Sequence, residues 1–110
     1  MSDGTKKKQV VITSQANDFI FSQSISVVNR FVELIHKLET VGQLMIPDAK
    51  KVDKELFELR LRTEGNQYRA FYCYAVGNII YVLSGFIKKT QKTPLSEIRK
   101  AHRIMKGLGL

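Results

Sequence analysis

Six polar residues in the middle of the chain could share one face of a β-sheet, and four of them are cations. The segment Leu56–Arg62 alternates apolar and polar residues, as a half-buried strand does, so its polar side chains should all face one way. If the next two strands follow through two-residue turns, the same face gains polar residues from both. The expected set is Glu58, Arg60, Arg62, Arg69, Ser84 and, if the last strand runs on, Lys88.

A group of cations like this one suits a phosphate. Like charges that oppose each other on a sheet repel by up to about 1 kcal/mol, so folding alone gives little reason to gather them. An arginine binds two phosphate oxygens at once and stays ionised, whereas the pKa of a lysine can fall among other cations until it exchanges a proton. The alternative interpretation is an ordinary solvated outer face. Glu58, the only carboxylate of the set, could be a general base or an ion-pair partner of Arg60 or Arg62, and a lysine or a tyrosine could be the base instead.

The elements that must position this face are a meander of strands and the helices around it. Gln9–Thr13 predicts a first strand. From Ser14 to Val41, apolar residues recur at three- and four-residue steps, which predicts two helices, the longer one capped by Ser24 and ended by Gly42. The polar segment 43–54 is expected to be a connection, and it leads to predicted strands at 56–62, 68–74 and 79–86.

The turns decide which residues of the meander oppose each other. Gly65-Asn66 and Gly77-Asn78 suit two-residue type II′ turns, because glycine supplies the positive φ of the first turn position. Under this reading the opposed pairs are Glu64 and Gln67, Arg62 and Arg69, Val76 and Ile79, Phe71 and Ser84, and Arg69 and Phe86.

A last helix should start at Thr93-Pro94, with the threonine as its cap and the proline at its first position. The expected order is therefore β-α-α-β-β-β-α, an α+β fold in which a mostly antiparallel sheet packs on two N-terminal helices. With 110 residues, of which 44% are hydrophobic, the chain should form a single domain over residues 1–110.

The positive charge of the chain lies in its second half. The formal net charge is +8, and residues 59–110 hold ten Lys and Arg against two Glu, whereas the cations and anions of residues 1–58 cancel. Such an asymmetry indicates a surface for a polyanion, although charge that merely aids solubility would look the same.

Other chemistries find little support in the residue types. The two histidines and the single cysteine, Cys73, do not form a metal-ligand pattern, and no Ser/His/Asp arrangement is evident, so no metal or other cofactor is expected. No apolar stretch approaches the roughly eighteen residues of a membrane span, and the apolar run after the first lysines is too short for a signal peptide. We therefore predict a soluble, cytoplasmic protein without a membrane partner.

Three consecutive segments resemble the signatures of one protein family. Leu56–Arg60, Tyr68–Tyr72 and Leu83–Pro94 resemble, in that order, an "lfELR" strand, a "yR.ly" strand and an "L.gF.KKtqktP" strand and loop. These are the signatures of the phage-derived HigB-like branch of the RelE/ParE toxin superfamily. The third segment is the most specific of the three.

The resemblance implies a RelE-like α+β toxin whose basic sheet face receives RNA. Relatives of this kind cleave mRNA by aligning the ribose 2′-hydroxyl on the adjacent phosphorus, and they need no metal. The resemblance implies that this cleavage takes place on the ribosome. Matched position by position, Arg60, Arg69, Lys88 and Lys89 are expected to be catalytic. The expected nucleic-acid contacts are Arg62, Lys92, Arg99 and Arg103.

The resemblance also implies a partner, a HigA-like helix-turn-helix antitoxin. Two other functions remain open at this stage. A ParE-like inhibitor of DNA gyrase would share the fold without needing the basic sheet face, and a non-catalytic RNA-binding protein would keep the charges without cleaving.

Overall fold

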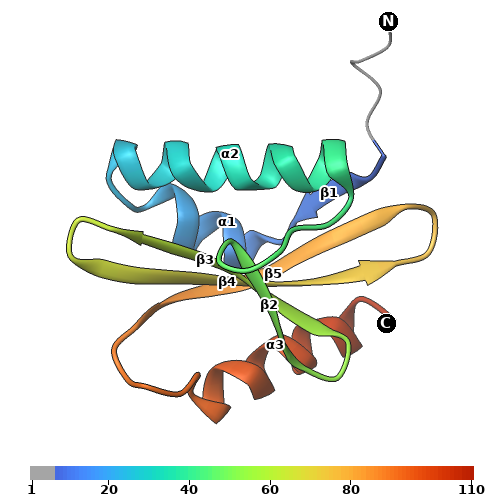
Figure 1. Cartoon of the computed structure of the whole chain (residues 1–110). Coiled ribbons are helices and arrows are strands. Elements are labelled where there is room, and N and C mark those ends of the chain that lie inside the picture. The colour runs from blue at the N-terminus through green and yellow to red at the C-terminus, as the bar shows by residue number, and fades with distance from the viewer. Residues whose placement is uncertain (1–6) are drawn as a thin grey trace, which may run out of the picture.

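In the computed structural model, residues 7–110 form a five-stranded sheet with helices on both faces (Figure 1). The strands are β1 (Gln9–Ile12), β2 (Ala49–Asp53), β3 (Leu56–Thr63), β4 (Asn66–Ala75) and β5 (Ile79–Lys88). Their order across the sheet is β1-β5-β4-β3-β2, and only β1 and β5 are parallel. The α+β class is thus confirmed. The start of the chain, on which the expectation about a signal peptide bears, lies partly outside the described residues.

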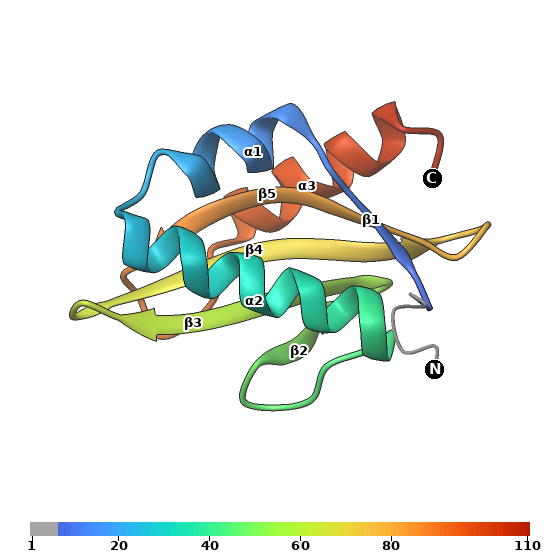
Figure 2. The same cartoon turned by 90° about the horizontal axis from the view of Figure 1, so that it is seen from above.

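Two helices cover one face of the sheet and a third lies against the other. Figure 1 shows α1 (Ser14–Phe21) and α2 (Ile25–Val41) above the strands and α3 (Leu95–Gly107) beneath them. In Figure 2, which is seen from above, α2 passes in front of the strands and α3 lies behind β5. A Cβ at Gly85 would lie 2.3 Å from a ring carbon of Phe19, so this glycine is what lets α1 approach β5 closely. Within residues 7–110 no helix combines the length and the apolar character that crossing a membrane would require.

The predicted ends of α2 are confirmed, whereas the predicted cap of α3 is wrong. Ser24 accepts a hydrogen bond from the Val27 amide, and Gly42 ends the helix with a φ of 93°. Helix α3 begins only at Leu95, and the residue before it, Pro94, offers no side-chain cap. The hydroxyl of Thr93 points elsewhere, to Glu58 at 3.4 Å.

Strand β2 lies within residues 43–54, for which the sequence predicts only a connection. Its residues are mostly polar, and polar strands are typical of sheet edges, where one side of the backbone stays open. The strand pairs with β3, and Lys50 is the direct partner of Glu58. It therefore adds a cation to the face that carries Glu58.

The first hairpin is shifted from the predicted register. Its turn residues are Glu64 and Gly65, both with positive φ (53° and 76°), as in a type I′ turn. Hydroxyls of Ser24 and Ser26 bond the Glu64 carboxylate, which helps to hold a residue that rarely adopts this backbone conformation. Arg60, and not Arg62, therefore opposes Arg69, and Gln67 opposes Arg62.

The second hairpin agrees with the predicted register only in the half that is farther from its turn. Phe71 opposes Ser84 and Arg69 opposes Phe86, as expected, but Ile79 opposes Ala75 and not Val76. The difference comes from a β-bulge, because Phe71 and Tyr72 pair with Ser84 and Val82 and leave Leu83 as an extra residue.

Each face of the sheet has its own core. On the first face the apolar side of α2 packs on strand residues such as Leu59, Leu61 and Tyr72, which confirms the alternation of β3. On the second face α3 covers a smaller core, which consists of Leu56, Phe71, Cys73, Leu83, Phe86, Ala101 and Met105. Glu58, Arg60 and Arg62 of β3 lie on this second face, and they form the centre of the candidate site.

Candidate functional site

A buried carboxylate lies at the centre of the charged face. The Glu58 side chain is only 2% exposed, and its Oε2 lies 3.6 Å from Nε of Arg60 and 3.5 Å from Nε of Arg69. Its Oε1 accepts a hydrogen bond from the Thr93 hydroxyl. The predicted ion pair with Arg60 is thus present, and Arg69 is a second partner.

Arg69 is buried although it lies on a face that the alternation left open to solvent. The residue is 3% exposed. Its Nη1 donates to the carbonyl oxygen of Tyr68 at 3.1 Å and its Nη2 to Oε1 of Gln67 at 2.8 Å, while its Nε makes no hydrogen bond. Burial lowers the pKa of Arg69, the charge of Glu58 opposes this shift, and Arg60 and Arg62 add to it. Arginine remains ionised under such a shift, so this is a fixed positive charge.

The cations follow two rows that run across the sheet. One row holds Arg60 on β3 and Arg69 on β4, and the next holds Arg62 on β3, Gln67 on β4 and Lys88 on β5. Because β5 runs on through Lys88, this lysine joins the face as expected. Burial lowers the pKa of Lys88, and Arg69, Arg60 and Lys50 lower it further while Glu58 opposes them.

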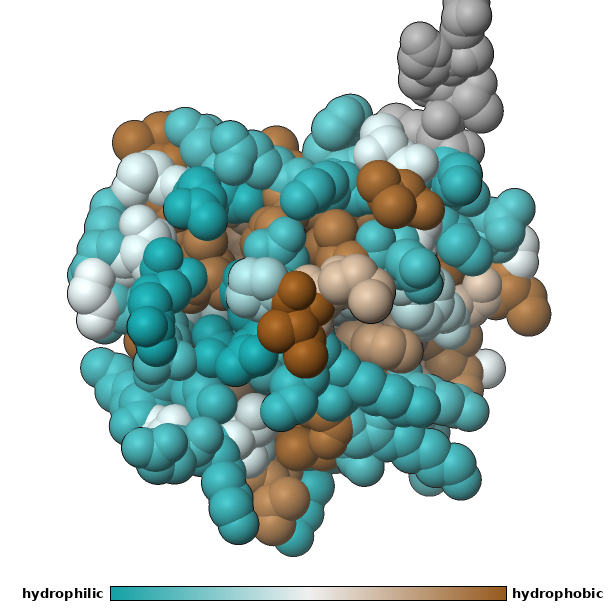
Figure 3. Space-filling model, in the orientation of Figure 1, coloured by the Kyte–Doolittle hydropathy of each residue, from teal (hydrophilic) through white to brown (hydrophobic). Residues whose placement is uncertain are grey.

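Two hollows open beside these rows, and both are lined by Arg60, Arg62 and Gln67. The first, of about 350 Å³, also contacts Arg69 and is closed by Arg30, Pro47 and Asp48. The second, of about 600 Å³, is completed by Lys88, Lys89, Thr90 and Gln91. In Figure 3 hydrophilic side chains cover the lower left of the molecule, where Figure 1 shows the loop between β5 and α3.

The four residues expected to be catalytic are therefore close together. Arg60, Lys88 and Lys89 line one hollow, and Arg60 and Arg69 line the other. Of the expected nucleic-acid contacts, Arg62 lines both hollows, and Lys92 is exposed in the loop that follows β5. Arg99 and Arg103 are exposed on α3, and Arg103 lines a different groove.

Ser84 is on the expected face but does not belong to the open site. It is 1% exposed, and its hydroxyl has no hydrogen-bond partner among the described residues. The β-strand alternation was right about its face, but it could not show that the core under α3 extends over that part of the strand.

Three residues of the site were missed by sequence reasoning. Gln67 lies two residues before Arg69, so the same alternation could have placed it on this face. Lys50 and Asp48 belong to a segment that was taken for a connection, and only the pairing of β2 with β3 brings them to the site.

His102 and Cys73 are not among the residues that line the two hollows. His102 pairs with Asp53 at 2.9 Å, and this contact is the main reason why the pKa of Asp53 is lowered. Burial raises the pKa of the Cys73 thiol to about 11, so the group stays protonated at neutral pH. Among residues 7–110, no three His, Cys, Asp or Glu side chains are grouped to hold a metal ion.

Comparisons with known proteins give a family and a fold. The model of the family described as "Phage derived protein Gp49-like (DUF891)" matches residues 18–106. A search of curated proteins found no significant match.

Two solved structures share the fold at low sequence identity. A mutant of the E. coli toxin RelE in the free state superimposes with a TM-score of 0.65 and 13% identity, over 88% of this chain and 96% of that chain. A chain of the toxin-antitoxin complex RelBE2 from Mycobacterium tuberculosis superimposes with a TM-score of 0.58 and 16% identity, over 74% of this chain and 99% of that one.

Proposed function

Because this chain belongs to the Gp49-like family of phage-derived proteins and shares the fold of RelE toxins, we propose that it is the toxin of a type II toxin-antitoxin pair. We further propose that it acts as an endoribonuclease on mRNA, bound to the ribosome, and that a HigA-like helix-turn-helix antitoxin neutralises it. Its place of action is then the cytoplasm.

The observation that carries this proposal is the excess of positive charge around the two hollows. Arg60, Arg62, Arg69 and Lys88 lie in adjacent rows of the sheet, and the carboxylate of Glu58 is already engaged by two of them. A phosphodiester in the hollows would relieve the repulsion among these cations. Preorganised charge of this kind is often the largest contribution to catalysis.

The reaction that suits such a site uses a nucleophile supplied by the RNA. The ribose 2′-oxygen attacks the adjacent phosphorus, a bond forms between them, and the bond from phosphorus to the 5′-oxygen breaks. The products end in a 2′,3′-cyclic phosphate and a 5′-hydroxyl. The protein must bind the phosphate, stabilise the negative charge of the phosphorane, accept the 2′-hydroxyl proton and protonate the leaving oxygen.

The two paired arginines take the phosphate. Arg69 is fixed by its bonds to Tyr68 and Gln67 and lines the smaller hollow, so we assign it to the charge that develops on the phosphorane. Arg60 is more accessible and lines both hollows, which suits it to orient the phosphate. Glu58 holds both guanidinium groups in place, and its burial favours this positioning role over that of a general base.

Proton transfer falls to groups at the edges of the hollows. Lys88 has a lowered pKa and lines the larger hollow, so it can donate a proton to the leaving 5′-oxygen, with Lys89 binding RNA beside it. Asp48 lines the smaller hollow with Arg69, and 36% of its side chain is exposed although its Oδ2 lies 3.3 Å from Nζ of Lys37. We assign this carboxylate to the 2′-hydroxyl proton.

Gln67 is a further substrate contact in this scheme. Arg69 donates to its Oε1, so the amide nitrogen is the atom left to donate. Gln67 lies between Arg62 and Lys88 in the same row and lines both hollows, where this nitrogen can reach a phosphate oxygen. Arg62 and Lys92 would hold the flanking RNA, with Arg99 as an outer contact on α3, whereas Arg103 lines a groove away from both hollows.

The decisive experiment maps transcript ends after purified protein is added to mRNA with and without translating ribosomes. New 5′-hydroxyl ends that form only with ribosomes would support the full proposal. Ends that form equally without ribosomes would support cleavage but contradict the requirement for the ribosome. RNA that is bound but intact would identify a non-catalytic binding protein. Intact RNA together with inhibited DNA gyrase would identify the ParE-like alternative.

A further inference from the structure

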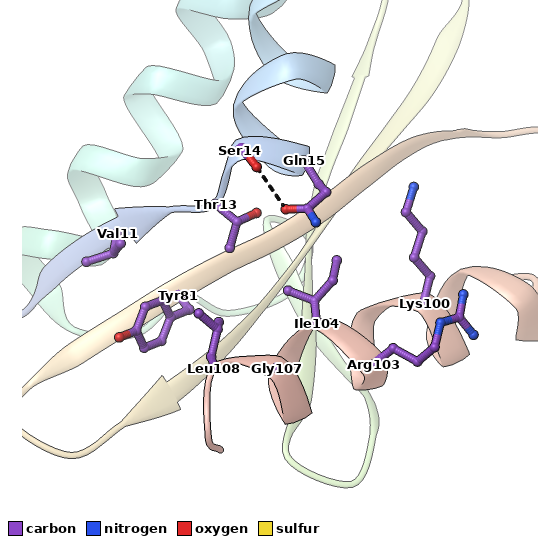
Figure 4. A pocket seen from close by; sticks show the side chains of 10 residues that line it. All are labelled: Val11, Thr13, Ser14, Gln15, Tyr81, Lys100, Arg103, Ile104, Gly107 and Leu108. Atoms are coloured by element: carbon purple, nitrogen blue, oxygen red, sulfur yellow. Dashed lines mark hydrogen bonds between the residues drawn. The ribbon is translucent and has the colours of Figure 1, made fainter.

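A groove on the second face of the sheet lies apart from the basic site. Helix α3 does not cover this face as far as the edge strand β1, and a groove of about 600 Å³ lies between α3, β5 and the start of α1 (Figure 4). The groove shares no lining residue with the two basic hollows. Its Tyr81 is seven residues from Lys88 along β5, which corresponds to roughly 23 Å.

The groove is lined by apolar side chains that the fold leaves without a cover. Val11 and Tyr81 are cross-strand partners on β1 and β5, and both are only partly buried. Ile104 of α3 and Leu108, the residue that caps the end of this helix, complete the wall, and Leu108 is 40% exposed. Two helices cover the first face of the sheet, whereas α3 alone lies on the second face (Figure 1). The groove beside α3 therefore has the place that a second helix on this face would occupy.

Two cations flank one end of this apolar wall. Lys100 and Arg103 project from α3 at the end away from Tyr81 and Leu108 (Figure 4). Neither side chain has an ion pair with any carboxylate in residues 7–110. Across the groove, the hydroxyl of Ser14 donates a hydrogen bond to the side chain of Gln15. A ligand that fills the groove would therefore bring apolar groups for the wall and carboxylates for its end.

We propose that this groove is the docking site for an acidic, amphipathic helix of a partner protein. The stretch of α3 from Lys100 to Leu108 is about 12 Å long, which matches two turns of a helix laid beside it. RNA fits less well, since the wall has four apolar residues and only two cations beside it. The identification of the partner as the antitoxin rests on the proposed function. The chemistry of the groove is independent of that function.

The proposal is tested with a phage-displayed library of helical peptides panned on the whole protein, followed by affinity measurements with the enriched peptides. Two groove variants, Lys100→Glu and Leu108→Glu, are compared with matched controls on the same helix that do not line the groove, Lys106→Glu and Leu95→Glu. Thermal unfolding of all four variants confirms that each is folded. Both leucines are exposed, so their replacement should be tolerated.

We expect enriched peptides with apolar residues at helical spacing and carboxylates at one end. Their affinity should fall roughly tenfold or more in each groove variant and stay within about twofold in the controls. Enriched peptides that bind all four variants alike would overturn the proposal, and so would enrichment of basic peptides. RNA binding that is lost in both groove variants but kept in the controls would make the groove part of the nucleic-acid surface and would equally overturn it. None of these results depends on RNA cleavage, so the proposed nuclease function can fail or hold independently.

Discussion

Arg60 and Arg69 are direct cross-strand partners, and the carboxylate of Glu58 lies within 3.6 Å of the Nε atom of each. Two arginines that would repel each other are thus held together by one buried anion. The arrangement holds Arg69 rigidly, with its outer nitrogens bonded to Tyr68 and Gln67, and leaves the more accessible guanidinium of Arg60 to contact a phosphate directly.

Replacing Arg69 should therefore affect both activity and stability. Arg69→Ala is expected to lower RNA cleavage about a hundred- to a thousandfold, because one charge on the phosphorane is lost. It should also lower the free energy of unfolding by about 3–5 kcal/mol, because a buried ion pair is broken. The double variant Glu58→Gln, Arg69→Met removes both charges and should recover much of the stability but no activity. Denaturant unfolding and cleavage assays on both proteins separate the effects, and an active, folded Arg69→Ala protein would contradict the assignment.

Lys88 and Lys89 should differ although they are adjacent. Lys88→Ala is expected to slow single-turnover cleavage at saturating RNA, whereas Lys89→Ala should weaken binding and reduce its salt dependence by about one ion. As a proton donor, Lys88 must be protonated, so the rate should fall as the pH rises through a pKa below the ordinary 10.5. If Lys89→Ala slows the saturated cleavage step and Lys88→Ala changes only binding, then Lys89 is the proton donor and Lys88 the binding residue.

Gln67 should contribute to binding through its amide nitrogen. Gln67→Met keeps the shape of the side chain and should raise KM or the RNA dissociation constant by roughly fivefold, because a hydrogen bond is worth about 1 kcal/mol. Gln67→Glu places a negative charge beside the phosphate and should weaken binding more. Gln43→Met, exposed on the connection before β2, is the matched control. Equal RNA affinity of the wild type and Gln67→Glu would exclude this contact.

Asp48 is expected to accept the 2′-hydroxyl proton. Asp48→Asn preserves the shape of the residue and should reduce the saturated rate by about a hundredfold or more while leaving RNA affinity near that of the wild type. Unchanged single-turnover cleavage by a folded Asp48→Asn protein would show that another group is the base, and Glu58→Gln would be examined next.

The chemistry of cleavage can be checked without any variant. Chelation by EDTA should leave the rate unchanged, since the scheme uses only side chains and the ribose. A substrate with a single 2′-deoxy nucleotide at the cleavage site should resist. Cleavage of that substrate, or activity that magnesium restores after chelation, would mean that water is the nucleophile.

The sequence predicted the fold class and the polar face, because both follow from periodicity. The alternation of β3 put Glu58, Arg60 and Arg62 on one face, and a register error of two residues in the first turn did not change that. The error did change the partners, since Arg60 and not Arg62 opposes Arg69. A turn that begins at Glu64 depends on a hydrogen bond from Ser24, forty residues away, which local sequence does not reveal.

Burial was the property that could not be predicted at the site. Arg69 and Ser84 were placed on the correct face, yet both are buried there, because neighbours from other elements cover them. Strand β2 was missed for a related reason, since its polar residues are compatible with a strand only once β3 is beside them.

The bulge at Leu83 has a consequence for how this family can change length during evolution. A one-residue insertion or deletion elsewhere in β5 would turn over every later side chain and carry Lys88 to the opposite face. Loss of Leu83 alone would restore regular pairing without reversing either half of the strand, because Ser84 and Val82 already oppose neighbouring residues of β4. Relatives whose β5 is one residue shorter should therefore have their alignment gap at Leu83, with the lysine still facing the arginines.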